Sequence, residues 1–161
     1  MNGVAQRGDR QADQGAAAVE FALVSVLLFT ILFGILQYGF GFFQMQAVAA
    51  TTQEAARLAA VGLYPKGAID GCTNFGNAVA TRGEDNGLPA ASVKTVKVNW
   101  SDSLGNNLAE RGGTATIQVV VEPTDFHYPF VPFPDTITRT LTITVENVGT
   151  VTGPCTANPN P

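Results

Sequence analysis

The sequence contains few of the residues that catalysis and metal binding require. It has a single histidine, His127, and two cysteines among its 161 residues. A histidine-activated nucleophile, or a metal site built from histidine and cysteine, needs several such groups close together. We therefore expect no catalytic residues, no metal site, no cofactor and no small-molecule substrate. A membrane-tethered hydrolase would need a base and oxyanion donors that the sequence does not supply.

Basic residues are also scarce. Nine lysines and arginines stand against thirteen acidic residues, and the net charge is -4. The basic residues are scattered from Arg7 to Arg139 without forming a cluster. Binding to nucleic acid depends on several cations placed along a phosphate backbone. Nucleic acid is therefore not among the expected partners.

The most informative absence is a long stretch without charge. No charged residue occurs in the 33 positions between Glu20 and Glu54. At about 1.5 Å per residue, a helix of that length measures roughly 50 Å, against roughly 30 Å of bilayer hydrocarbon. The sequence therefore predicts a transmembrane helix over residues 16–43, with the lipid bilayer as a partner. Four aromatic residues near its end resemble an interfacial belt: Tyr38, Phe40, Phe42 and Phe43.

The polar residues 1–15 precede this span and are interpreted as a cytoplasmic leader peptide. Arg7 and Arg10 favour a cytoplasmic N-terminus, because positive charge is retained on the inner side of the membrane. Everything after the span is then periplasmic or extracellular. A secretory signal peptide cut near Ala47 is the competing interpretation, but its apolar core would have only about 7 to 15 residues.

After the span, residues 44–61 predict an amphipathic helix extension. Its apolar positions recur at spacings of three and four, and most of them are alanines, so another element can approach the helix backbone closely. Gly62 and Pro65 are expected to end the helix.

Residues 62–161 predict a β-rich extracytoplasmic domain. A short helix is expected within residues 71–82. Residues 92–100, 114–122 and 136–146 alternate apolar and polar side chains, as strands of an antiparallel sheet do. The expected fold class is α+β: a long N-terminal transmembrane helix that continues into an amphipathic helix, packed on a small antiparallel β-sheet of three or more strands. Residues 149–161 are expected to form a flexible tail.

One carboxylate, Glu20, lies at the start of the apolar run, five residues after Gly15. A charge costs up to roughly 3 kcal/mol at the middle of a bilayer and less near its surface. Glu20 therefore either marks the interfacial start of the span or has a function there.

The pattern of Gly15, Glu20, Phe21 and a long apolar helix resembles the processing site of type IV pilins. The fuller run over roughly residues 14–60, which ends in Glu54, two alanines and Arg57, resembles the TadE-like proteins. These proteins are minor pilins, or pseudopilins, of the Tad (tight adherence, Flp) pilus.

This resemblance implies a pilin-like fold and cleavage by a prepilin peptidase between Gly15 and Ala16. It implies that Glu20 and Phe21 act in assembly and in setting the register between subunits. The implied partners are the peptidase, other pilins and the membrane proteins of Tad pilus assembly. The implied location is single-pass in the bacterial inner membrane, at the base of the pilus or in the filament.

A second interpretation of the function stays open. The protein would be a single-pass, membrane-anchored periplasmic binding or sensing module, in which Gly15 and Glu20 are coincidental. This alternative predicts that the N-terminus is not processed.

The two cysteines, Cys72 and Cys155, both follow the span. In an oxidising compartment a bridge between them would close a loop of about 80 residues and stabilise the domain by roughly 4 kcal/mol. The alternative is a pair of free thiols.

A loop rich in aromatic residues and proline follows the second predicted strand. It contains four aromatic residues that form either a small core cluster under the sheet or a partner surface: Phe126, Tyr128, Phe130 and Phe133.

Overall fold

The computed structural model describes residues 6–60, 70–101, 111–124, 132, 134–146 and 155–159. The chain divides into two compact units. The first contains the long N-terminal helix as far as Gly39, and the second contains the rest of that helix from Phe40 together with the sheet. Each unit is described separately below.

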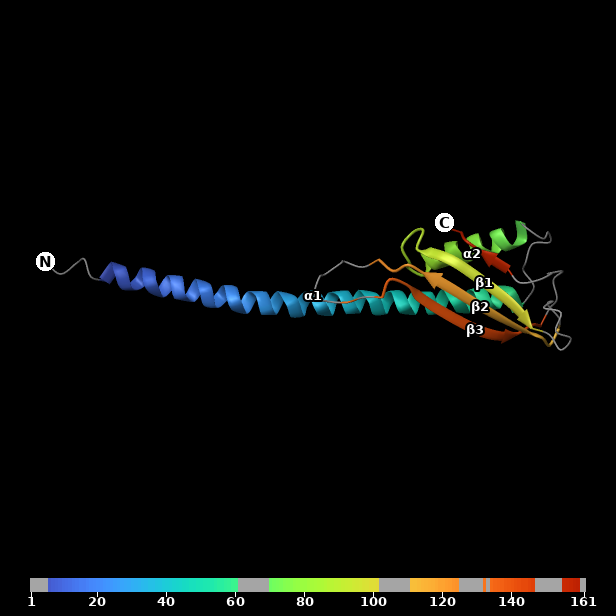
Figure 1. The fold of residues 1–161 in the computed structure, drawn as a ribbon, viewed down its shortest axis with the longest axis horizontal. Helices are drawn as coiled ribbons and strands as arrows, with labels where there is room; N and C mark the ends of the chain where they lie inside the picture. Colours follow the sequence, from blue (N-terminus) through green and yellow to red (C-terminus); the bar gives the residue numbers. More distant parts are fainter. Residues whose placement is uncertain are drawn as a thin grey trace. The chain divides into compact units, whose positions relative to one another are not determined.

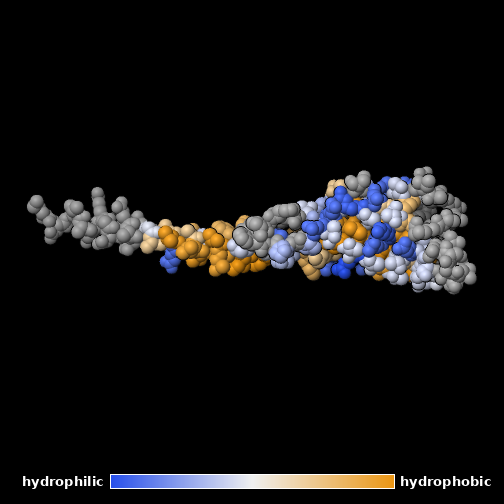
Figure 2. Space-filling model, viewed as in Figure 1, coloured by the Kyte–Doolittle hydropathy of each residue, from blue (hydrophilic) through white to orange (hydrophobic). Residues whose placement is uncertain are grey.

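Helix α1 extends over Gln6–Ala60 and has 55 residues. It therefore begins inside the segment expected to be a polar leader and ends one residue before the expected position. Large apolar side chains are exposed along its first unit, from Val19 to Leu36, and Figure 2 shows this part of the helix in apolar colours. No sheet covers these side chains within their unit, as expected for a helix that meets lipid.

The second unit has two layers, helices on one side and a sheet on the other (Figure 1). After α1 come α2 (Asp70–Asp85), β1 (Val93–Ser101), β2 (Thr114–Val121), β3 (Ile137–Thr144) and β4 (Cys155–Ala157). The sheet has the order β3-β2-β1-β4, and its neighbouring strands are antiparallel. The expected α+β fold, with a long apolar N-terminal helix and an antiparallel sheet, is confirmed.

Strand β4 lies within residues 149–161, which the sequence predicted to be a flexible tail. Over Cys155–Ala157 that prediction was wrong, because these three residues pair with Val96, Lys97 and Val98 of β1. The helix expected within residues 71–82 is present but longer, since α2 extends over Asp70–Asp85.

The core lies between the sheet and the two helices. Strand β2 has an alternating pattern of burial, in which Ala115, Ile117, Val119 and Val121 are fully buried. Alanines dominate the buried stripe of α1, as its sequence predicted, and Phe75 and Val79 come from α2. The buried α1 residues in this core are Ala47, Val48, Ala55, Ala56 and Ala59.

Contacts of α1 with the domain begin before residue 44, where the sequence placed the change from span to amphipathic helix. Gly87, which follows α2, has a φ of 91° and packs under the ring of Phe43. A Cβ atom at Gly87 would lie 2.8 Å from Cζ of Phe43. Phe43 is thus part of the second unit, although the prediction assigned it to the membrane span.

The buried amide of Gln44 joins α1 to the chain that follows β2. Its Nε2 donates to the carbonyl oxygen of Thr124 at 2.8 Å, and the backbone N–H of Thr124 donates to Oε1 at 2.9 Å. Both polar groups of the amide are therefore satisfied by one residue, as buried polar groups require.

Candidate functional site

Gly15 and Ala16 lie on the exposed surface of α1. A Cβ atom added at Gly15 would meet no other atom within 4 Å. In this structure, therefore, packing gives no reason for a glycine at position 15, and glycine weakens a helix by about 1 kcal/mol relative to alanine.

Glu20 and Phe21 follow on the same exposed helix, and Phe21 is 74% exposed. Glu20 comes four residues after Ala16, so the two residues lie on one face of the helix, one turn apart. Within the part of the chain that the structure describes, Glu20 forms no ion pair. Its carboxylate therefore remains accessible to a cation at the start of the helix or on another molecule.

The helical segment after Glu20 is suited to the apolar interior of a membrane. The helix over Gly15–Ala60 is long and apolar enough to cross a membrane, with a mean hydropathy of 2.5 over 18 residues. The hydroxyls of Ser25 and Thr30 donate to the carbonyl oxygens of Ala22 and Val26. Both hydroxyls therefore donate within the helix and need no hydrogen bond to water, which is absent from the interior of a bilayer.

A disulfide joins Cys72 of α2 to Cys155 of β4, with the two Cα atoms 5.7 Å apart. This is the bridge that the sequence left open against two free thiols. Gly76, one helical turn after Cys72, faces Ala157 so closely that a Cβ atom at position 76 would collide with the Ala157 side chain. The bridge and the glycine together hold the short strand β4 against α2.

The structure does not describe the other residues for which the sequence suggested a function. The four aromatic residues of the loop (Phe126, Tyr128, Phe130 and Phe133) lie outside the described residues, as does His127. In the described ranges, no group of three or more His, Cys, Asp or Glu side chains is placed to hold a metal ion.

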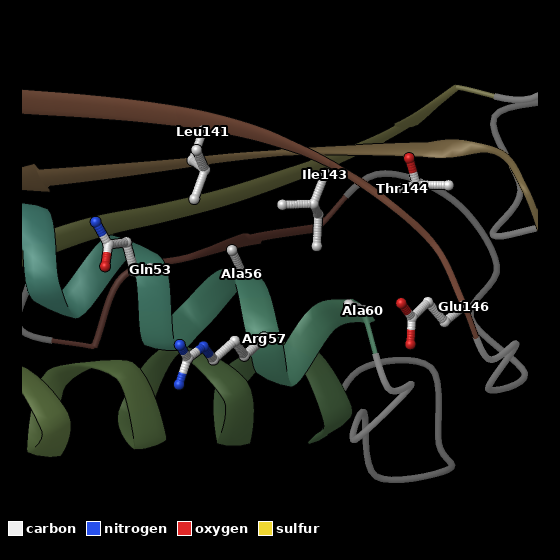
Figure 3. Close-up of a pocket in the computed structure, with 8 residues that line it drawn as sticks. All are labelled: Gln53, Ala56, Arg57, Ala60, Leu141, Ile143, Thr144 and Glu146. Atoms are coloured by element: carbon white, nitrogen blue, oxygen red, sulfur yellow. The ribbon is translucent and has the colours of Figure 1, made fainter.

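The sequence reasoning missed a groove between α1 and β3, shown in Figure 3. It has a volume of about 430 Å³. Residues of α1 line one side, and residues of β3 and the chain just after it line the other: Gln53, Ala56, Arg57 and Ala60, and Leu141, Ile143, Thr144 and Glu146. The feature of the sequence that could have drawn attention to this face of β3 is Arg139, because it places a charge among the apolar residues of the strand.

These features define a class of protein: one N-terminal helix able to span a membrane, followed by a two-layer α+β domain. Residues 15–57 match the family model described as TadE-like protein, which confirms the resemblance seen in the sequence. The match begins at Gly15, includes Glu20 and ends in the amphipathic part of α1. No curated protein and no solved structure matches the chain. The matched residues lie within α1 and make up about a quarter of the chain.

Proposed function

We propose that this protein is a minor pilin, or pseudopilin, that takes part in the assembly of a Tad pilus after a prepilin peptidase has removed residues 1–15. The observation that supports this proposal is that the TadE-like match starts at Gly15 and extends over Glu20 and the apolar helix. The role of the protein is structural rather than enzymatic. Its partners are the peptidase, other pilins and the membrane proteins of pilus assembly.

The chemistry takes place at the bond between Gly15 and Ala16. Hydrolysis of this amide by water leaves a carboxylate on Gly15 of the leader and a free ammonium group on Ala16. The new ammonium lies one helical turn from the Glu20 carboxylate. In a medium of low dielectric constant, pairing of the two charges offsets much of the cost of burying each.

The ammonium that pairs with Glu20 belongs either to the same chain or to a neighbouring subunit. Pairing between neighbours requires that the two helices lie at one particular offset, because a shifted helix leaves both charges unpaired in an apolar environment. Glu20 thus sets the register between subunits, and Phe21 and the exposed apolar residues after it supply the packing surface.

Two features support the proposed orientation in the inner membrane. Arg7 and Arg10 favour a cytoplasmic N-terminus, and the Cys72–Cys155 disulfide is typical of an oxidising compartment such as the periplasm. In this proposal the α+β domain lies outside the cytoplasm.

Processing is tested by the intact mass and N-terminal sequence of the protein purified from membranes of its native host. We expect a chain that begins at Ala16. Gly15→Leu should leave the chain uncut, because the peptidase has to accommodate the residue before the cleaved bond. Gly39→Leu is the matched control, since Gly39 is also an exposed α1 glycine with no atom near its Cβ position, and this variant should be cut normally. An uncut wild-type chain in cells with an active prepilin peptidase would contradict the proposal and favour the membrane-anchored binding or sensing module.

The role of Glu20 is tested separately with Glu20→Gln. We expect this variant to be processed but to leave pilus assembly strongly reduced, as measured by the yield of sheared pili and by surface adherence. Glu84→Gln changes an exposed glutamate of α2 and should assemble normally. Normal assembly of Glu20→Gln would show that the carboxylate does not set the register.

A further inference from the structure

Strand β4 contributes little to the core of the domain. It has three residues and pairs with Val96, Lys97 and Val98, in the middle of the nine-residue β1. Its two buried side chains, Cys155 and Ala157, are small. Among the described residues, the largest fully buried side chains belong to the helices, to β1 and β2 and to Val145, and none belongs to β4. Because burial of apolar surface is the main stabilising contribution to a domain, the core depends little on this strand.

The contacts that β4 makes besides the disulfide are weak. Fixing three residues in an extended strand costs conformational entropy, which these contacts have to offset. Gly76 of α2 has no side chain to pack against Ala157. Next to the strand, Oγ1 of Thr95 donates to Oδ1 of Asn158 at 3.2 Å, but this hydrogen bond is exposed to water, so its net contribution is small. The bridge from Cys155 to Cys72 therefore supplies a large share of what holds β4 against β1 and α2 (Figure 1).

The rest of the domain is held together by contacts that do not involve β4. Strand β1 pairs with β2 from Val93 to Ser101, and β2 pairs with β3. Just after β3, the backbone N–H of Val145 donates to the carbonyl oxygen of Gly113 at 2.9 Å. The next N–H, of Glu146, donates to the carbonyl oxygen of Ala60 in α1 at 3.3 Å. The chain is thus fixed as far as Glu146 without β4.

The two cysteines of the bridge differ in their access to solvent. Cys72, in the first turn of α2, is half-buried, whereas Cys155 is only 5% exposed. Thiol–disulfide exchange begins when a thiolate attacks one sulfur of the bridge, and its rate depends on access to that sulfur. A thiolate from outside therefore attacks Cys72, and Cys155 is the leaving group.

We propose that the Cys72–Cys155 disulfide is a redox latch, which a dithiol opens to release β4 while the rest of the domain stays folded. One thiolate of the dithiol attacks the sulfur of Cys72, forms a mixed disulfide with it and displaces Cys155 as a thiolate. The second thiol of the dithiol then attacks the dithiol's own sulfur in the mixed disulfide and displaces Cys72. Two electrons and two protons pass from the dithiol to the two cysteines, and the dithiol becomes a cyclic disulfide. Release of β4 uncovers the edge of β1 at residues 96–98.

Amide hydrogen exchange tests the release on the full-length protein in detergent micelles, with and without dithiothreitol. In the oxidised protein the amides of Cys155–Ala157 should be protected. After reduction they should exchange as fast as in an unfolded chain. The amides of Thr114–Val121 in β2 should then exchange at least about 100-fold more slowly than those of β4, because the free energy of unfolding that remains after reduction still protects them.

A variant without the bridge is the control for the reductant. The double variant Cys72→Ala, Cys155→Ala should show unprotected β4 and protected β2 without dithiothreitol, and the reductant should not change its exchange. The proposal is overturned if β2 and β4 lose their protection together, in the reduced protein or in the variant, because the whole domain then unfolds. It is also overturned if β4 stays protected after reduction, because other contacts then hold the strand.

Reduced glutathione locates the attacked sulfur, because a monothiol stops at the mixed disulfide. The oxidised protein is treated briefly with glutathione, and the free thiols are then alkylated with iodoacetamide. Peptide masses should show glutathione on Cys72 and the alkyl group on Cys155, in at least about fivefold excess over the reverse arrangement. An equal or reversed distribution would contradict attack at Cys72 and the proposed order of steps. None of these outcomes depends on cleavage at Gly15, so failure here and failure of the proposed function are distinguishable.

Discussion

Loss of the Cys72–Cys155 disulfide should destabilise the α+β domain as a whole. The two cysteines are 83 residues apart in sequence, and the chain-entropy model gives about 4.5 kcal/mol for closing a loop of that length in the unfolded chain. A domain of this size has a free energy of unfolding of about 5–15 kcal/mol. The double variant Cys72→Ala, Cys155→Ala should therefore retain only a small part of the stability, or unfold.

Trp100 makes this measurement direct. It is the only tryptophan of the chain and is 3% exposed in β1, the strand that pairs with β4. Urea unfolding of the full-length protein in detergent, followed by its fluorescence, gives the free energy of unfolding of the sheet. A thiol reductant should reduce the stability of the wild type to that of the double variant and should have no effect on the double variant. A loss below about 1 kcal/mol would refute the reasoning, because the bridge would then not restrict the unfolded chain.

Two further changes test the packing of the same domain by the same measurement. Gly76→Val should lower the free energy of unfolding by about 1–3 kcal/mol, because its side chain collides with Ala157 and forces β4 away from α2; unchanged stability would mean that β4 is not held there. Gln44→Leu should cost about 1–3 kcal/mol by removing both hydrogen bonds to Thr124. The matched control Gln46→Leu, at an exposed position two residues later, should change the stability by less than about 0.5 kcal/mol, and equal effects at the two positions would contradict this account.

The features that repeat along the sequence were predictable. The uncharged run predicts the apolar part of α1. The alternation of apolar and polar residues predicts β1, β2 and β3 to within a few residues of their observed bounds. The three strands follow from a local pattern, because each turns its apolar side chains to one face of the sheet.

The features that depend on distant contacts were not predictable. Strand β4 consists of Cys, Thr and Ala, which have no strand pattern, and it is extended because β1 and the disulfide hold it. The pairing of Gln44 with Thr124 joins residues 80 positions apart, and nothing in a polar helix residue indicates its partner. The groove beside β3 depends on where α1 lies under the sheet, which the pattern of either element does not specify.

The disulfide also has a consequence for how the protein is made. Cys72 emerges from the ribosome before Cys155, which lies 83 positions later, and at about 5–20 residues per second this part of the chain takes about 4–17 s to synthesise. During this interval Cys72 is an unpaired thiol. Because the chain contains no third cysteine, only one bridge can form within it, and the competing partner is a thiol on another molecule. Errors in oxidation should therefore appear as covalent dimers or mixed disulfides, and never as misfolded monomers with a shuffled bridge.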